Sequence, residues 1–224
     1  GSVACNFGPG IDSAATITAW DPPRRFAAEG EGMSPGMPPM ATEWIVEARS
    51  GGTCIVRVVH SLFASTDDWD DQLESTEAGW PTFFRILELY LEHFPGQPGR
   101  SASLMAMLSG ELSEAWTALA GALGIEGARP GDRCAATVEG APSLRGIVEP
   151  LGEIPNGHRI LMRLDAPAPG AAVIGVHACG GANMVSVNLY IYGEQASEIV
   201  DRDVPRWQAW LSERFPAPEA ASAS

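Results

Sequence analysis

The chain has 224 residues and a net charge of −14 at pH 7, and 45% of its residues are hydrophobic. This length allows one large domain or two small ones, each long enough to bury a core. The acidic balance argues against nucleic acid and anionic membrane surfaces as partners, because binding to phosphates needs basic residues, and the absence of a run of about 18 apolar residues argues against a transmembrane helix.

The four cysteines, Cys5, Cys54, Cys134 and Cys179, are widely separated and form no CxxC pair. The four histidines show no zinc-like spacing, so we expect no metal site and no cofactor. All 14 basic residues are arginine, which is typical of a GC-rich genome. The start of the chain lacks the basic and apolar regions of a signal peptide. We therefore expect a cytoplasmic protein with reduced thiols.

The first half of the chain predicts a set of antiparallel strands. Residues 11–30 predict two strands joined at Asp21-Pro22-Pro23, because the two prolines impose a bend. Residues 41–49 and 53–63 alternate between apolar and polar positions on either side of Ser50-Gly51-Gly52, which is a hairpin signal. Both faces of residues 53–63 are largely apolar, so we expect this strand to be covered on both sides.

An acidic stretch, STDDWDDQLESTEA (65–78), precedes a long amphipathic segment. The acids lack the pattern of an EF-hand loop and predict a solvated helix entrance. Apolar residues then recur at helical spacing over residues 79–96: Trp80, Phe84, Leu87, Leu91 and Phe94. We expect a short acidic helix, a break at Gly79, and a main helix from Pro81 to about His93, where Pro95-Gly96 ends it.

The pattern restarts after residues 95–100. A strand at 101–108 and a helix at 111–125 precede four strand-like runs, a clearly alternating strand at 183–193, and a helix at about 196–214. The apolar face predicted for this last helix consists of Ile199, Val204, Trp207, Trp210, Leu211 and Phe215. The two halves share an order of elements, which indicates an internal repeat. We predict a partial unit at 1–96, a linker at 97–100, a second unit at 101–218 and a disordered tail at 219–224.

Residues 10–95 resemble the Hsp90-ATPase-activator-homologue group of the START-like (SRPBCC, helix-grip) superfamily. The resemblance rests on ITAWDPPRRFAAEG, on the pair ATEWIVEA and GGTCIVRVVHSLF, and on DDWDDQLESTEAGWPTFFRILELYLEHF. The second half is similar to the same superfamily in its order of elements, with LRGIVEPL and NLYIYG. The resemblance implies an α+β fold in which a curved antiparallel sheet grips a long C-terminal helix around an apolar cavity, present as two tandem units.

Family members begin with a strand and two short helices that this chain lacks before residue 11. An unfilled sheet edge would expose unpaired backbone groups. We therefore expect the first sheet to be completed by a second copy in a homodimer, by a missing N-terminal segment, or by the second unit.

The resemblance implies a small hydrophobic molecule as the ligand, bound without catalysis between the sheet and the C-terminal helix. The candidate lining residues are Trp44, Arg57, His60, Trp80 and Phe84 in the first half and His177 and Tyr190 in the second. For each of them the competing interpretation is a core or structural role.

Two alternatives stay open. One is a polyketide cyclase- or aromatase-like enzyme, which needs a titratable group such as His60 or His177 inside the pocket. The other is a Hsp90-activator-like, stress- or chaperone-associated interaction protein, which an exposed apolar patch would favour. The sequence contains no HExxH or Walker motif.

Overall fold

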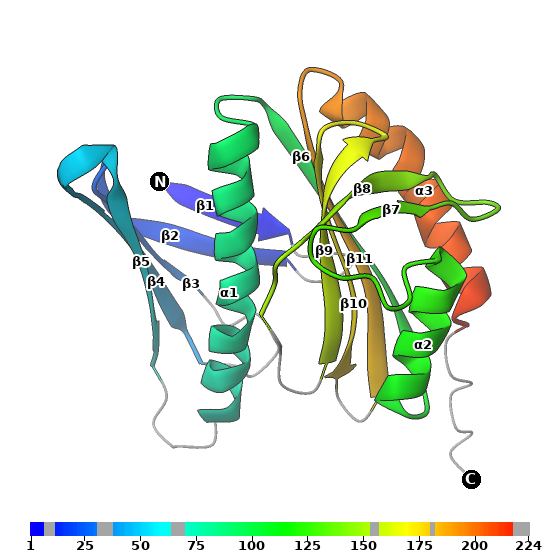
Figure 1. Cartoon of the computed structure of the whole chain (residues 1–224). Helices are drawn as coiled ribbons and strands as arrows, with labels where there is room; N and C mark the ends of the chain where they lie inside the picture. The colour runs from blue at the N-terminus through cyan, green and yellow to red at the C-terminus, as the bar shows by residue number, and fades with distance from the viewer. Residues whose placement is uncertain (7–11, 31–37, 64–69, 153–156, 180–181, 217–224) are drawn as a thin grey trace, which may run out of the picture. The chain divides into compact units, whose positions relative to one another are not determined.

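A computed structural model describes residues 1–6, 12–30, 38–63, 70–152, 157–179 and 182–216 (Figure 1). The chain forms two compact units, residues 1–76 and residues 77–224, and the boundary falls within helix α1 (Asp70–His93). The fold is α+β, with one antiparallel sheet in each unit, as predicted.

The first unit is a five-stranded antiparallel sheet in which each strand pairs with its neighbours in sequence. Its strands are β1 (Ser2–Asn6), β2 (Asp12–Asp21), β3 (Arg25–Gly30), β4 (Met40–Ala48) and β5 (Cys54–Leu62). The two predicted hairpins, β2–β3 and β4–β5, are confirmed. Strand β1 was not predicted, and it pairs with β2 from Ser2 opposite Thr16 to Asn6 opposite Asp12.

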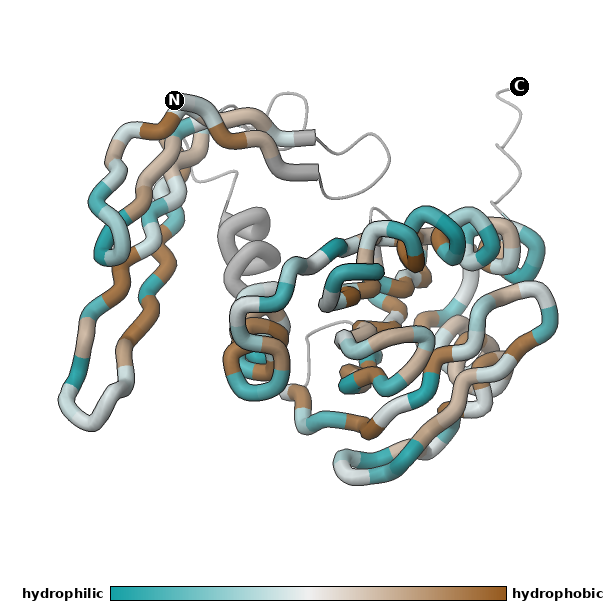
Figure 2. The backbone as a smooth tube through the Cα atoms, turned by 90° about the horizontal axis from the view of Figure 1, so that it is seen from above, coloured by the Kyte–Doolittle hydropathy of each residue, from teal (hydrophilic) through white to brown (hydrophobic). Residues whose placement is uncertain are grey.

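The turn between β4 and β5 confirms the glycine signal. Gly51 and Gly52 have φ angles of 79° and 75°, a left-handed conformation that glycine adopts without steric cost. Hydrophobic and hydrophilic residues alternate along this hairpin (Figure 2). The expectation that both faces of β5 are covered is wrong, because the side chains of Ile55, Val59 and Phe63 are 41%, 37% and 56% exposed.

The second unit contains a six-stranded antiparallel sheet in the order β6-β11-β10-β9-β8-β7. Its strands are β6 (Gly99–Leu108), β7 (Arg133–Ala136), β8 (Leu144–Glu149), β9 (Gly157–Ala166), β10 (Gly170–Cys179) and β11 (Ala182–Tyr192). Helices α2 (Leu112–Leu123) and α3 (Ala196–Arg214) complete the unit. The predicted order of strand, helix, strands and long C-terminal helix is confirmed, and the sheet packed on α3 has the helix-grip arrangement.

The two faces of this sheet are covered by different helices. Successive residues of a strand point to opposite faces, and in β11 the buried Val185, Val187 and Leu189 join the core with α2 and α3. Tyr190, one position further on, packs with α1 instead. The alternation predicted for residues 183–193 is therefore confirmed, and we call the two sides the α3 face and the α1 face.

Helix α1 differs from its prediction in two ways. It is continuous from Asp70 to His93 and passes through Gly79 and Pro81 without the predicted break. Within residues 79–93, where side chains are described, the buried ones are Thr82, Ile86 and Leu89, and Leu91 is 58% exposed. At 100° per residue, the predicted face around Trp80 and Leu91 lies on the opposite side of the helix from this buried face.

The compact units also divide the chain earlier than the predicted linker. Ile86 and Leu89 of α1 pack against Leu161, Ala171 and Val173 of the second sheet, and β6 already begins at Gly99, inside residues 97–100. The predicted tail at 219–224 lies outside the described residues. None of the helices in the described part of the chain has the length and apolar character needed to cross a membrane.

Candidate functional site

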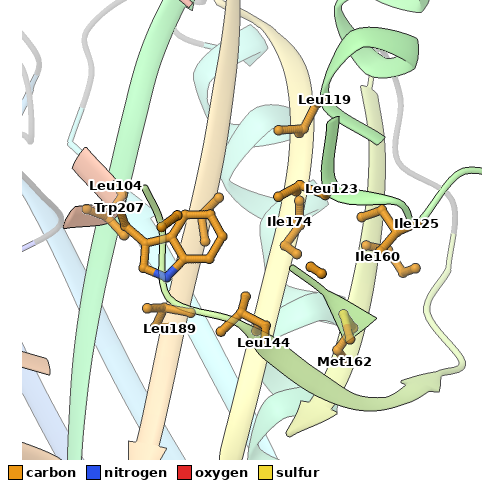
Figure 3. Packing of buried hydrophobic residues seen from close by; sticks show 14 of the residues in the cluster. Leu104, Leu119, Leu123, Ile125, Leu144, Ile160, Met162, Ile174, Leu189 and Trp207 are labelled. Carbon is orange, nitrogen blue, oxygen red and sulfur yellow. The ribbon is translucent and has the colours of Figure 1, made fainter. Parts of the chain in front are cut away.

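The α3 face of the second sheet forms the largest apolar interior in the described residues. Trp207 of α3 lies fully buried beside Leu104, with Leu189 and Leu144 next to it (Figure 3). The wall toward α2 is made of aliphatic side chains of α2, β9 and β10: Leu119, Leu123, Ile160, Met162 and Ile174. These residues come together because side chains alternate between the two faces of each strand and because the apolar residues of α3 lie along one side of the helix.

One polar atom in this interior lacks a partner. The Trp207 indole Nε1 is buried and has no hydrogen-bond acceptor among the described residues, and Figure 3 shows it directed toward the side where Leu189 and Leu144 lie. The neighbouring Trp210 packs edge-to-face on Trp207, with ring centroids 5.5 Å apart. A buried N–H donor without an acceptor costs about 1–3 kcal/mol, so this position favours an acceptor from outside the chain.

The other buried polar side chain of α3 has its partner. The Asp203 carboxylate accepts hydrogen bonds from Nε and Nη2 of Arg202 at 2.7 and 2.8 Å. At the α2 end of the α3 face, the exposed His158 of β9 stacks on Trp116, with ring centroids 5.8 Å apart and planes 22° apart. The imidazole of His158 thus lies at the border of the apolar interior.

The α1 face carries charge. Glu149 of β8 is almost buried and accepts hydrogen bonds from Arg163 of β9 at 2.8 Å and from Arg85 of α1 at 3.0 Å. Two cations around one carboxylate tie the helix to the sheet beside the contact of Leu89 with Leu161. This cluster is a structural ion-pair network whose acid has both of its oxygens occupied.

The sequence predicted that His177 and Tyr190 line a cavity beside the C-terminal helix. In the structure both residues lie on the α1 face. His177 has the same strand parity as Ala171 and Val173, which pack under α1. His177 and Tyr190 therefore do not line the interior next to α3. Burial lowers the pKa of His177, and the nearby positive charge of Arg159 lowers it further. Burial raises the pKa of Tyr190.

The first unit brings together two of its three candidates. Trp44 and His60 share one face of the sheet, where Trp44 lies opposite Val58, and the His60 Nδ1 is 3.0 Å from the Thr42 hydroxyl. Burial lowers the pKa of His60. Arg57 lies on the opposite face, exposed, with Nη1 3.7 Å from Glu47.

Trp80 and Phe84 are half-buried on α1, with ring centroids 5.6 Å apart. They do not belong to the α3 face either.

Trp207 was not among the candidate site residues predicted from the sequence. The sequence predicted only that it lies on the apolar face of the last helix. The residue type itself could have indicated a polar group at this position, because a buried tryptophan places an indole N–H donor in the core.

No protein-family model matches this chain, and no curated protein matches it. Solved structures that are similar to it include the following three. DynU16, a protein in the dynemicin biosynthetic locus, is 18% identical, with 96% of this chain and 81% of that chain covered and a TM-score of 0.35. The di-domain ARO/CYC BexL from the BE-7585A biosynthetic pathway is 15% identical, with 92% and 81% covered and a TM-score of 0.31.

The third, the di-domain ARO/CYC StfQ from the steffimycin biosynthetic pathway, is 12% identical, with 89% of this chain and 72% of that chain covered and a TM-score of 0.32. TM-scores below 0.5 do not establish a common fold. The assignment of the second unit as a helix-grip arrangement therefore rests on its own strand order and on the packing of α3.

Proposed function

We propose that the second unit binds a small hydrophobic molecule on the α3 face, with the Trp207 indole as its polar anchor. The observation that carries this proposal is the fully buried Nε1 donor, which has no acceptor among the described residues of this mainly apolar interior. The ligand class is an apolar, ring-sized molecule with one accepting oxygen, such as a ketone or a quinone.

The binding energy would come from two sources. Burial of apolar ligand surface contributes about 25 cal/mol per Å². The oxygen would accept the Trp207 N–H and remove the cost of an unpaired donor, which makes an acceptor-bearing ligand bind more tightly than its hydrocarbon parent. Selectivity for the acceptor is thus the signature of this site.

A ligand pair tests the proposal without depending on how much a variant disturbs the core. We would measure the binding of 9-fluorenone and of its parent fluorene to the full chain and to Trp207→Phe, with Trp210→Phe as the matched control. We expect the wild type to prefer the ketone by about fivefold or more, because one neutral hydrogen bond contributes about 1 kcal/mol. Trp207→Phe should abolish the preference and Trp210→Phe should keep it.

Equal preferences in the wild type and Trp207→Phe would contradict the role of the indole. Failure of both compounds, and of a wider panel of polycyclic ketones and quinones, to stabilise the chain against heat would contradict ligand binding on this face.

A second candidate is a polyketide cyclase- or aromatase-like enzyme that uses the same interior. BexL and StfQ are described as ARO/CYC proteins. The observation in this chain that favours it is His158, an imidazole stacked on Trp116 at the border of the apolar interior. Cyclisation of a polyketide analogue that His158→Gln slows at least tenfold, while ligand binding stays unchanged, would support catalysis. No turnover by the wild type would leave binding as the function.

The remaining expectations concern the first unit. Its exposed Ile55, Val59 and Phe63 are the feature that favours an interaction protein of the Hsp90-activator kind. Completion of the first sheet by a second copy or by a further N-terminal segment, and a cytoplasmic location, remain predictions. Sedimentation of the full chain at several concentrations tests the homodimer.

A further inference from the structure

Arg159 is an exception among the half-buried arginines of the described residues. The other half-buried arginines, Arg85 and Arg163, both donate to Glu149. Arg159 lies on the same strand and face as Arg163, four residues earlier, and has no carboxylate within 4.0 Å among the described residues. Its only hydrogen bond there joins Nη2 to the Gly152 carbonyl at 3.4 Å, and its buried Nε has no partner.

A half-buried guanidinium in this position is costly for the chain alone. Removal from water disfavours a charge, and burial accordingly lowers the pKa of Arg159. An anion that reached Nε and a terminal nitrogen together would form the bidentate pair that guanidinium groups favour. The arrangement therefore points to a negatively charged ligand.

The register of the strands shows which residues lie next to Arg159. Gly175 of β10 lies opposite Arg159 on one side and opposite Ser186 of β11 on the other, and His177 is next along β10 on the same face. A Cβ at Gly175 would come within 2.8 Å of the His158 carbonyl and 3.0 Å of the Arg159 Cβ. A side chain at Gly175 would thus collide with β9, so the glycine lets β9 and β10 approach closely beside Arg159.

Helix α1 contributes a second polar group without a partner. The Thr82 side chain is 7% exposed, and its hydroxyl has no hydrogen-bond partner among the described residues. Phe94, just after the helix, stacks on Tyr192 at one end of β11, and Leu89 packs on Leu161. Thr82 lies seven residues before Leu89 on the same side of the helix, about 10 Å along its axis, which we infer brings it near the level of Arg159, Gly175 and Ser186.

The same face also offers apolar surface. By register, Met105 lies opposite Ser186, Met184 opposite His177, and Met107 opposite Met184. All three methionines are partly buried. Flexible thioether side chains adapt to varied apolar shapes, so they suit the hydrocarbon part of a ligand rather than an inorganic ion.

We propose that Arg159, with His177 and Thr82, binds the carboxylate of a small amphipathic acid on the α1 face of the second sheet, with the acid's hydrocarbon part against the methionines. A single negative charge matches the site, because burial and the charge of Arg159 both disfavour the protonated form of His177, and a doubly charged phosphate would leave excess charge half-buried. This site is separate from the α3 face and does not depend on the ligand proposed there.

The experiment compares hexanoate, acetate and inorganic phosphate on the full chain by calorimetry, with His177 followed by NMR. The variants are Arg159→Gln and, as the matched control, Arg145→Gln, which removes an exposed arginine of β8 that also has no carboxylate partner among the described residues. We expect hexanoate to bind at least tenfold more tightly than acetate or phosphate. Arg159→Gln should weaken hexanoate binding about tenfold or more, and Arg145→Gln should change it less than twofold.

Two further readouts separate binding from a structural role. Hexanoate should raise the pKa of His177, because the bound carboxylate cancels the charge of Arg159. Without any acid, Arg159→Gln should leave the melting temperature unchanged or higher, since it removes an unpaired charge. Equal hexanoate binding by wild type and Arg159→Gln, phosphate as the tighter ligand, or a clear loss of stability in acid-free Arg159→Gln would each overturn the proposal.

Discussion

The two faces of the second sheet are buried by the same alternation of side chains, yet they differ in chemistry. The α3 face is mainly aliphatic and aromatic, and among the described residues Trp207 Nε1 is a buried donor within it that has no acceptor. The α1 face combines a small apolar cluster around Leu89 and Leu161 with the ion pairs of Glu149 and with Arg159, which has no carboxylate partner in the described part of the chain. A sheet covered on both sides can thus keep a dry core on one side and place charged groups on the other.

The largest expected effect tests whether both faces are packed to a similar degree. Leu161 and Met162 are neighbours on β9 that point to the α1 face and the α3 face, and both are fully buried. We expect Leu161→Ala and Met162→Ala each to lower the free energy of unfolding in urea by about 2–5 kcal/mol. A cost below about 1 kcal/mol for Leu161→Ala alone would show that α1 covers its face only loosely.

A smaller effect is expected from the ion pairs of the α1 face. Glu149→Gln leaves two half-buried guanidinium groups with a neutral partner, so we expect a loss of about 1–3 kcal/mol of unfolding free energy, below the cost for a fully buried pair. Asp165→Asn is the matched control, since its pair with Arg133 is exposed, and we expect at most about 0.5 kcal/mol there. Equal costs would mean that burial adds nothing to the Glu149 network.

The smallest expected effect is a loss of stability at alkaline pH. Burial, with Tyr190 and Tyr90 nearby, raises the pKa of Tyr192 to about 12. The folded chain keeps this phenol neutral where the unfolded chain releases its proton, so stability should fall as the pH rises from about 10 to 12. Tyr192→Phe keeps the ring packed on Phe94 and should flatten this loss in urea titrations at pH 9 to 12. An unchanged alkaline slope would place the phenol in water.

Local patterns predicted much of the secondary structure. The Gly51-Gly52 turn predicted its hairpin, and the period of two in residues 183–193 predicted which side chains of β11 share a face. The spacing of Ile199, Trp207 and Leu211 predicted the buried stripe of α3. These features depend on backbone sterics and on the geometry of helix and strand, which neighbouring residues determine.

The same patterns could not assign partners. Helix α1 carries apolar residues on two opposite faces, and its sequence favoured the larger set around Trp80 over Ile86 and Leu89, which pack on the second sheet. His177 was expected beside α3, but strand alternation sets it facing α1 once the register of β10 is known. A periodic pattern defines the faces of an element and leaves open what covers each of them.

By itself, then, the sequence determined an α+β chain with antiparallel strands, a long final helix and an acidic surface, because these follow from short-range geometry and composition. Only the tertiary structure decided that Glu149 has two cationic partners and that, within the described residues, Trp207 Nε1 has no acceptor and Arg159 has no carboxylate partner. Those properties depend on which groups from distant strands and helices meet after water has been excluded, and no local periodicity encodes that meeting.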